Sequence, residues 1–409
     1  MIWATPLVKA EEPLWAKGIL LESGSDRYVL CTVDWCEICN ETDLAFRESL
    51  AAGAGTTASR VVVHSVHQHA SAYADKGAHD LLDKASNPPL HLSDKFLEDL
   101  SARLGKAAQE ARGRLEPFDR VGLGEARVER VASTRRLRGE DGKIIVRFSG
   151  GGADPKLAEA PEGPIDPLLK TITLSMGEQP LARLHYYATH PQTFCCDGRA
   201  SADFVGAARE ALERKEGAFQ LYFTGCAGDV TAGKYNDGSP KARADLGERL
   251  LAGMEAAIRA TRFGPAPAVV WRTAPLSLPL RRDKGYAPED LRAKLLNTKG
   301  SDGSRVYAGA MALSFVERAA RPLDVSSLEL GGVRILHLPG EPMLDFQLFA
   351  QKLKPEGFVA VAGYCDCGPG YVCTDAAYVE GGYEPTASNA APGSEALLKK
   401  AIRDCMEGR

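Results

Sequence analysis

Short apolar runs rich in β-branched residues alternate with amphipathic helical stretches along the whole chain of 409 residues. Residues 60–64 form a typical run of this kind, which predicts a buried strand. Ser93 or Asp94 caps a predicted helix that reaches about residue 115 and buries a face containing Phe96, Leu97 and Ala111. Further strands are expected at 18–21, 28–34, 171–175, 181–188, 220–223, 268–280, 328–330, 333–338 and 358–362, and further helices at 41–52, 241–260, from 288 and at 307–319. The mixture predicts an α/β fold, with a mixed sheet layered between helices (an α/β/α sandwich) in one domain spanning 1–409.

Composition excludes several functional classes. Hydrophobic residues make up 44% and charged residues 25% of the chain, as in soluble globular proteins. The net charge of -4 argues against a nucleic-acid-binding protein, which usually carries a basic face. No run approaches the roughly 18 apolar residues of a membrane span, and residues 1–13 do not resemble a signal peptide.

The ten cysteines are grouped closely in the sequence. The groups are Cys36 with Cys39, Cys195 with Cys196, and Cys365, Cys367 and Cys373. Adjacent cysteines are poorly placed to bond each other, so we expect reduced thiols and a reducing compartment such as the cytoplasm. A thiol redox role for Cys36 and Cys39 is an alternative, although one such pair is a weak signal.

Residues 139–167 are dense in glycine and proline. A stretch of this length exceeds the usual connection between two elements of a compact domain. We therefore expect a functional loop or a lid in this region.

Three of the eight histidines, His64, His67 and His69, follow the predicted buried strand at 60–64. Sites in α/β proteins usually lie at the carboxyl ends of strands. In an extended segment His67 and His69 face the same side, so both imidazoles can reach one point. Histidine is the commonest zinc ligand and also acts as a general acid or base. The alternative is a chance cluster of polar residues at a strand end.

Three later stretches also place a potential metal ligand directly after a predicted strand or a glycine-containing turn. His190 ends another predicted strand and precedes a proline, and Glu341 follows a Pro-Gly turn after an apolar strand. Tyr371 follows a Gly-Pro-Gly sequence and leads to Tyr383. Taken singly, a strand-end histidine is more often structural and a loop glutamate is more often solvated. Tyrosine is a rare metal ligand, because its pKa of about 10 must fall before it binds as a phenolate.

Taken together and in order, these stretches resemble the motifs of the neutral, non-lysosomal ceramidases, which are zinc amidases. The T-H-T-H-S-G motif of that family is similar to Val66-His67-Gln68-His69-Ala70-Ser71. Its A-T-H or A-I-H-P motif is similar to residues 188–191, its P-G-E motif to 339–341, and its Y-x-T-T-x-x-E-Y-x-x-Q-x-Y-E motif to 371–384. Weaker matches are Asp34, Thr134-Arg135-Arg136 for N-R-S, Ser201-Ala202-Asp203, and Gly228-Asp229-Val230-Thr231 for G-D-V-S-P.

The resemblance covers residues 13–384 and implies the fold of the ceramidase catalytic domain, without the C-terminal β-sandwich of longer ceramidases. It implies one zinc ion per chain, with the ligands His67, His190, Glu341 and Tyr371. It further implies that His69, Arg135 and Tyr383 line the reacting amide. Arg136 is the alternative to Arg135, because adjacent residues of a strand point in opposite directions.

Other residues are expected around this site. Asp34 either orients a histidine or caps a turn. Asp203, Asp229 and Thr231 are expected in the surroundings of the metal or in the pocket wall. Thr231 is a poor candidate for a nucleophile, because no base is assigned to it.

The sequence therefore predicts a zinc-dependent hydrolase that cleaves an amide bond of a small-molecule or lipid N-acyl substrate with a metal-activated water. The alternatives are a zinc-dependent deacylase of acylated sugars or of other small amides or esters, a metal-containing binding protein without catalysis, and the thiol redox protein. Imidazole, carboxylate and phenolate ligands suit zinc but tolerate other divalent ions. The acyl chain, the amine and the oligomeric state are left open by the sequence.

Overall fold

A computed structural model describes residues 7–85, 87–194, 197–296 and 302–408. Cys195 and Cys196 lie outside the described residues, and the eight described cysteines are free thiols. Among the described residues, no helix combines the length and the apolar character needed to cross a membrane.

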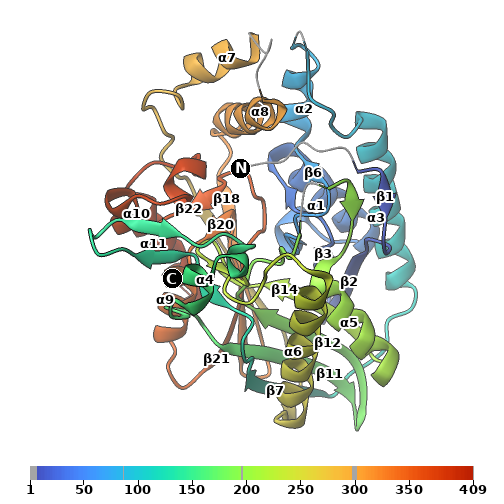
Figure 1. The fold of residues 1–409 in the computed structure, drawn as a ribbon. Helices are drawn as coiled ribbons and strands as arrows, with labels where there is room; N and C mark the ends of the chain where they lie inside the picture. The colour runs from blue at the N-terminus through green and yellow to red at the C-terminus, as the bar shows by residue number, and fades with distance from the viewer. Residues whose placement is uncertain (1–6, 86, 195–196, 297–301, 409) are drawn as a thin grey trace.

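Three sheets form the centre of the molecule (Figure 1). The first has the order β2-β3-β5, the second β14-β12-β11-β7-β16 and the third β17-β18-β19-β21. Their strands are β2 (Ala16–Ser23), β3 (Asp26–Val33), β5 (Val61–Ser65), β7 (Arg120–Arg127), β11 (Leu168–Met176), β12 (Gln179–Tyr187), β14 (Phe219–Thr224), β16 (Arg262–Pro265), β17 (Val270–Leu276), β18 (Leu323–Leu330), β19 (Val333–His337) and β21 (Phe358–Ala362). Each sheet contains one parallel pair, namely β3 with β5, β12 with β14, and β19 with β21.

All three sheets contribute to one apolar core, which includes Leu30, Phe223 and Leu328. Helices α1 (Asn40–Ala54) and α3 (Asp94–Arg112) pack beside the first sheet, α5 (Asp203–Glu216) and α6 (Pro240–Arg259) beside the second, and α9 (Leu344–Lys352) and α11 (Ser394–Glu407) beside the third. Helices α2 (Lys76–Leu82), α7 (Pro288–Leu296) and α8 (Gly303–Glu317) lie together at the top of Figure 1. The predicted α/β fold of sheets layered with helices is confirmed, with the strands divided among three sheets.

Short strands pair with one another in the loops outside these three sheets. They are β1 (Lys9–Ala10), β4 (Glu37–Ile38), β6 (Tyr73–Ala74), β8 (Ser133–Thr134), β9 (Arg136–Arg138), β10 (Ile144–Val146), β13 (Arg199–Ala200), β15 (Val230–Thr231), β20 (Glu341–Pro342) and β22 (Tyr371–Val372), and the short helices are α4 (Pro155–Glu159) and α10 (Asp375–Glu380). The hairpin β9–β10 and helix α4 lie within 139–167 or at its border. This stretch is therefore partly regular structure, and its role as a lid stays a prediction.

Helix α3 buries a narrower stripe than its sequence predicts. Leu97, Leu104 and Ala108 are buried, whereas Ala111 is exposed and Phe96 is 44% exposed. The reason is that α3 packs mainly along α1, and contact between two helices covers a smaller arc than contact with a sheet.

Candidate metal centre

Four elements bring the predicted metal ligands to one place. His67 follows the carboxyl end of β5, and His190 follows the carboxyl end of β12. Glu341 begins β20, which pairs in parallel with β22, so that Glu341 lies directly opposite Tyr371. These elements belong to different sheets or to their connecting loops, and the site lies between the carboxyl ends of β5 and β12 and the first residues of β20 and β22.

Three buried side-chain atoms converge at this point. The Nε2 atoms of His67 and His190 are 3.1 Å apart, and Oε2 of Glu341 lies 3.0 Å from the former and 3.2 Å from the latter. The three residues form one of two groups in the described chain whose geometry suits a metal ion, the other being Cys36, His67 and His69. The Tyr371 hydroxyl lies 3.4 Å from His190 Nε2.

Backbone carbonyls fix the tautomers of both histidines. His67 Nδ1 lies 2.7 Å from the carbonyl oxygen of Cys36, and His190 Nδ1 lies 2.6 Å from that of Ala227. A carbonyl accepts only, so each Nδ1 carries the proton and donates it. Each Nε2 is thereby free to present a lone pair to a metal, which is the usual arrangement of a metal-bound histidine.

These lone pairs test whether a cation fits. Two imidazole nitrogens and a carboxylate oxygen face one another, and Glu341 Oε2 makes no hydrogen bond of ordinary geometry although it is buried. Acceptors in this arrangement repel unless a cation or a proton lies between them. Ligand atoms about 2.0–2.1 Å from a tetrahedral zinc ion are about 3.3 Å apart, close to the spacing of these three atoms. The donor set therefore fits zinc.

The pKa shifts of these three groups reflect their burial and their interaction with one another. Burial opposes ionisation of Glu341, but the neighbouring imidazoles of His67 and His190 hold its pKa well below the usual value. Burial lowers the pKa of His190 to about 3. His67 is also buried, yet the Cys36 thiol and the Glu341 carboxylate raise its pKa well above the usual value. The carboxylate of Glu341 is therefore held ionised beside the two imidazoles, as a metal ligand would need to be.

The backbone of His67 is held in a strained conformation, with φ 73°. Its N–H donates to the carbonyl of Trp35, and its ring stacks on Tyr364 with 4.3 Å between the centroids. A left-handed conformation is uncommon for residues with a side chain and tends to occur at functional sites. The surrounding contacts thus hold His67 in the orientation that directs Nε2 towards the other ligands.

The side chain of Arg135 lies against the Tyr371 hydroxyl, to which Nη1 donates over 2.8 Å. Burial raises the pKa of Tyr371 well above its usual value, while the Arg135 charge opposes that rise. The Tyr371 hydroxyl therefore depends on nearby positive charge to ionise. Tyr383 packs edge-on against Tyr371 with 5.5 Å between the ring centroids, and the Arg135 guanidinium lies 5.5 Å from the Tyr383 ring.

His69 lies beside the two histidine ligands. Its ring centroid is 4.9 Å from that of His67 and 5.7 Å from that of His190. Neither ring nitrogen has a hydrogen-bond partner in the described part of the protein. Burial, together with the neighbouring histidines, lowers the pKa of His69 well below the usual value. The ring is therefore neutral and able to accept a proton.

Asp34 and Arg136 point away from this centre. The Asp34 carboxylate forms a two-point ion pair with Arg209 of α5 and accepts from the backbone N–H of Trp15. Among these bonds there is none to a histidine and none of a turn-capping type, so neither expected role matches its partners. Arg136 bonds to Glu380 and Glu384 on the opposite side of the chain from Arg135.

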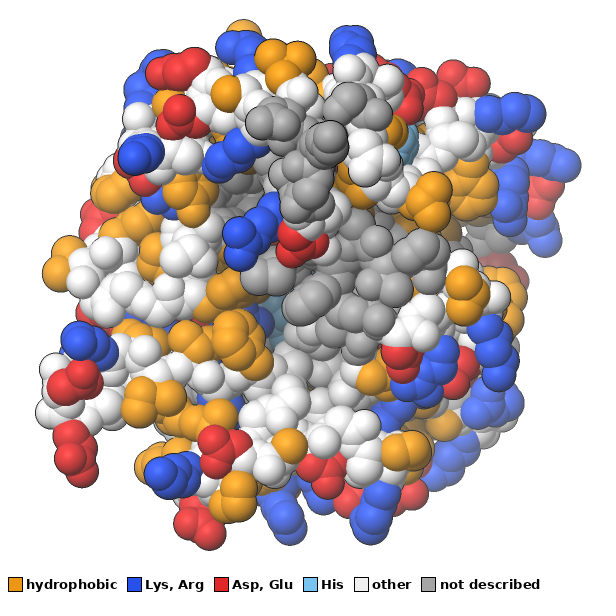
Figure 2. All heavy atoms as spheres, turned by 45° about the horizontal axis from the view of Figure 1, so that its top comes forward, with side chains coloured by type: hydrophobic (Ala, Val, Ile, Leu, Met, Phe, Trp, Pro, Cys, Tyr) orange, Lys and Arg blue, Asp and Glu red, His pale blue; other side chains and the backbone are white. Residues whose placement is uncertain are grey.

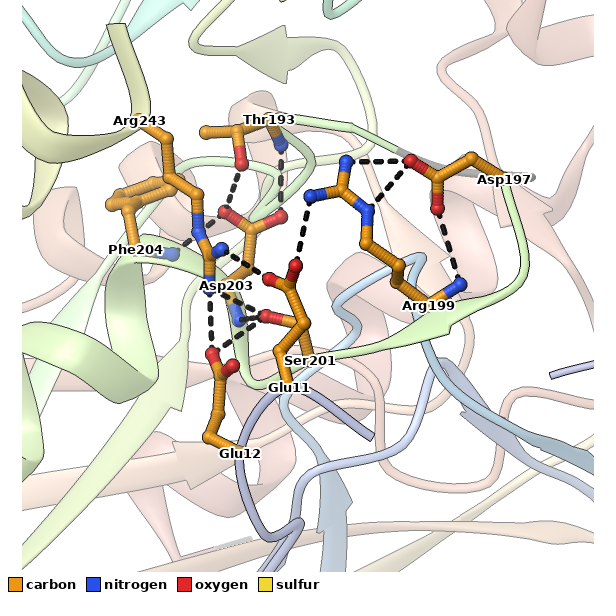
Figure 3. A network of polar contacts seen from close by, with 9 residues as sticks. All are labelled: Glu11, Glu12, Thr193, Asp197, Arg199, Ser201, Asp203, Phe204 and Arg243. Atoms are coloured by element: carbon orange, nitrogen blue, oxygen red, sulfur yellow. Dashed lines mark hydrogen bonds and ion pairs between the residues drawn. The ribbon is translucent and has the colours of Figure 1, made fainter. Parts of the chain in front are cut away.

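Asp203 forms hydrogen bonds to the loop that follows His190 (Figure 3). Its carboxylate accepts from the backbone N–H and the hydroxyl of Thr193, and its φ is 56°. The same network joins Ser201 and Arg243 to Glu12 near the N-terminus. The sequence prediction of Asp203 in the surroundings of the metal therefore corresponds to contacts with the loop rather than with a ligand side chain.

Asp229 and Thr231 belong to the segment whose backbone pairs with that of His190. The Asp229 carboxylate accepts from the N–H of Leu344 at the start of α9, and burial raises its pKa to about 6. Thr231 forms a backbone bridge to His190, and its hydroxyl lies 2.9 Å from that of Ser149. Its side-chain partner is thus another hydroxyl, which does not supply a base.

Tyr364 was missed by the sequence analysis. It stacks on His67, and its hydroxyl lies 3.4 Å from His190 Nδ1, so it touches both histidine ligands. Its position just after the buried strand β21 was the available signal, since the histidine ligands also follow strands. The carbonyls of Cys36 and Ala227 were missed as well, and no sequence pattern marks a backbone acceptor.

Figure 2 shows a face on which hydrophobic side chains are interspersed with charged ones, with a histidine side chain visible near the middle.

No protein-family model matches the chain, and no curated protein matches its sequence. Among solved structures, the neutral ceramidase from Pseudomonas aeruginosa matches with a TM-score of 0.69 at 16% identity, covering 98% of this chain and 69% of that one. A ceramidase complexed with C2 matches with a TM-score of 0.72 at 15% identity, covering 99% of this chain and 71% of that one. The chain therefore has the fold of these ceramidases.

Proposed function

We propose that the protein is a zinc-dependent amidohydrolase that cleaves an N-acyl bond. The observation that carries this proposal is the convergence of His67, His190 and Glu341, whose three buried acceptor atoms lie 3.0–3.2 Å apart. Tyr371, with its hydroxyl 3.4 Å from His190 Nε2, is the fourth ligand in this proposal. A zinc ion bound there lowers the pKa of a water ligand to about 7 and polarises a carbonyl group.

The protein groups around the centre supply the proton transfers. Hydrolysis of an amide removes a proton from water and delivers a proton to the leaving nitrogen. His69 is partly buried, and its ring nitrogens have no hydrogen-bond partner among the described residues, so it serves as the base and then as the acid. The Arg135 guanidinium and the Tyr383 side chain adjoin Tyr371 and stabilise the negative charge that develops on the amide oxygen.

The ceramidase names of the fold neighbours make N-acyl sphingoid bases the first substrates to test. The identity of 15–16% supports a shared fold, whereas the substrate depends on the residues that line the pocket. Acylated sugars and other small amides or esters use the same chemistry, so they belong in the same screen.

The thiol redox alternative receives no support from the environment of its cysteines. Cys36 and Cys39 are both buried, and burial raises the pKa of each thiol. A reactive cysteine needs an accessible thiolate, which these surroundings disfavour.

The test measures release of the amine from a short-chain ceramide and from an N-acetyl amino sugar, and release of the phenol from an aryl ester, with zinc supplied. We expect turnover of an N-acyl compound by the wild type and a loss of about 100-fold or more in His69→Ala. His91→Ala is the matched control, because the His91 ring bonds to Asp83 and to the carbonyl of Pro89 rather than to the centre. Turnover of the ester alone would favour the deacylase alternative. Zinc binding without turnover of any compound would favour the binding protein.

A further inference from the structure

Arg136 begins β9, directly after Arg135, and connects this strand to the loop that carries Tyr383. Its guanidinium donates to the carbonyl of Gly381 over 2.8 Å, to Glu384 Oε2 over 2.6 Å and to Glu380 Oε2 over 3.1 Å. The side chain of Arg136 is only 7% exposed, and that of Glu384 is fully buried. These are charge-assisted bonds in a partly buried setting, where such bonds are strongest.

The acceptors bracket Tyr383 in the sequence. Gly381 lies two residues before it, and Glu384 lies one residue after it. The intervening backbone has φ 74° at Gly381 and 99° at Gly382, which glycine adopts readily, and residues 381–383 belong to neither a helix nor a strand. A Cβ atom at Gly382 would lie 2.6 Å from Arg136 Nη1, which explains why glycine is needed where the guanidinium approaches.

Two consecutive residues, Arg135 just before β9 and Arg136 at its start, thus contact Tyr383 or its neighbours from two sides. The Arg135 guanidinium lies 5.5 Å from the Tyr383 ring and donates to Tyr371. Arg136 points to the other side and donates to the backbone carbonyl of Gly381 before Tyr383 and to the side-chain carboxylate of Glu384 after it. Figure 1 shows the corresponding arrangement, with the green hairpin after residue 135 beside the red segment that contains α10.

We propose that Arg136 is a positioning residue that sets the place of Tyr383 relative to Tyr371 and Arg135. This inference rests on the proposed function, because it gives Tyr383 a role next to the reacting amide. Misplacement of a catalytic group by about 1 Å can cost about 100-fold in rate. Arg136 touches neither the proposed ligands nor the reacting atoms, so its effect on turnover passes through Tyr383.

The test compares Arg136→Ala with Arg138→Ala. Arg138 bonds to the other oxygen of Glu380, but its side chain is 60% exposed, so it provides a matched loss of charge on the same strand. We expect Arg136→Ala to lower kcat/KM about 10- to 100-fold, mainly through kcat, and Arg138→Ala to change it less than about twofold. Glu384→Gln removes the charge of the closest acceptor, and we expect a smaller loss of the same kind. This second variant serves if Arg136→Ala does not fold.

A double-mutant cycle separates positioning from general support of the fold. If Arg136 acts through Tyr383, then Arg136→Ala in a Tyr383→Ala background lowers kcat/KM no further. An equal loss from Arg136→Ala with and without Tyr383 would overturn the proposal.

Hydrogen exchange provides a readout that does not depend on turnover. We expect faster deuterium uptake by residues 378–386 in Arg136→Ala than in Arg138→Ala, with zinc content unchanged in both. If the wild type hydrolyses no N-acyl compound, the proposed function fails and this exchange result alone decides whether Arg136 holds the loop. Unchanged exchange in Arg136→Ala would overturn the inference.

Discussion

Replacing Asp34 by Asn tests how much a buried ion pair contributes to stability. The pair joins Asp34, which follows β3, to Arg209 of α5. Arg209 Nη1 and Nη2 donate to the two carboxylate oxygens of Asp34 over 2.7 Å and 2.8 Å, and both side chains are 1% exposed. The second oxygen also accepts from the N–H of Trp15 over 2.9 Å. The substitution keeps the shape of the side chain but leaves the buried Arg209 with only the partly exposed Glu210 carboxylate, 3.1 Å from Nε, as its counter-charge.

The expected loss follows from this geometry. Removing one partner of a buried pair costs about 3–5 kcal/mol, because the remaining charge stays desolvated. We expect a loss near the lower end of that range in the free energy of unfolding of Asp34→Asn, because Glu210 still pairs with Arg209. Replacing both partners, in Asp34→Leu/Arg209→Met, removes the uncompensated charge, and we expect it to restore most of the stability.

Urea unfolding followed by tryptophan fluorescence measures these differences, since the chain has four tryptophans. Zinc content is measured in parallel on the folded protein, and we expect it to match the wild type because the Asp34 carboxylate bonds to Arg209 and Trp15. A loss below about 1 kcal/mol in Asp34→Asn would refute the reasoning about the buried pair. A folded Asp34→Asn protein without zinc would show instead that Asp34 acts on the metal site.

Two further predictions concern helix packing and pH. A Cβ at Gly53 would lie 2.0 Å from the carbonyl oxygen of Gly105, where α1 crosses α3, so we expect Gly53→Ala to cost about 2 kcal/mol or more. Gly309 in α8 has no such neighbour within 4 Å, so we expect Gly309→Ala to stabilise the protein by about 0.5–1 kcal/mol. Calorimetry of both variants measures the contrast. A change in stability of the same sign in both variants would contradict it. Burial raises the pKa of Asp75 to about 7, from an unfolded value of about 3.9, so the folded state binds the proton more tightly and the wild type loses stability as pH rises from 4 to 7. We expect Asp75→Asn to gain up to about 4 kcal/mol relative to the wild type across that range, and parallel stability curves from pH 4 to 7 would contradict the assignment.

The local structure around the site was predictable from sequence because it depends on neighbouring residues. The apolar run at 60–64 is strand β5, and the strands expected at 328–330 and 333–338 correspond to the end of β18 and to β19. The strand ends at His67 and His190 also lie close together, as the resemblance to ceramidases implies.

Contacts between distant residues were not predictable in the same way. The partner of Asp34 is 175 positions away in the sequence, and no local pattern indicates it. The stacking of Tyr364 on His67 depends on how two sheets meet. The assignment of Arg135 and Arg136 to different sides was anticipated from strand geometry, but the side that faces Tyr371 required coordinates.

The most direct test of the proposed metal centre is the zinc content of the purified protein by elemental analysis, compared with that of His190→Ala. The account predicts about one zinc ion per wild-type chain and a large loss in the variant, with His91→Ala retaining the metal. A wild-type protein that neither contains zinc nor takes it up when supplied would contradict the central claim.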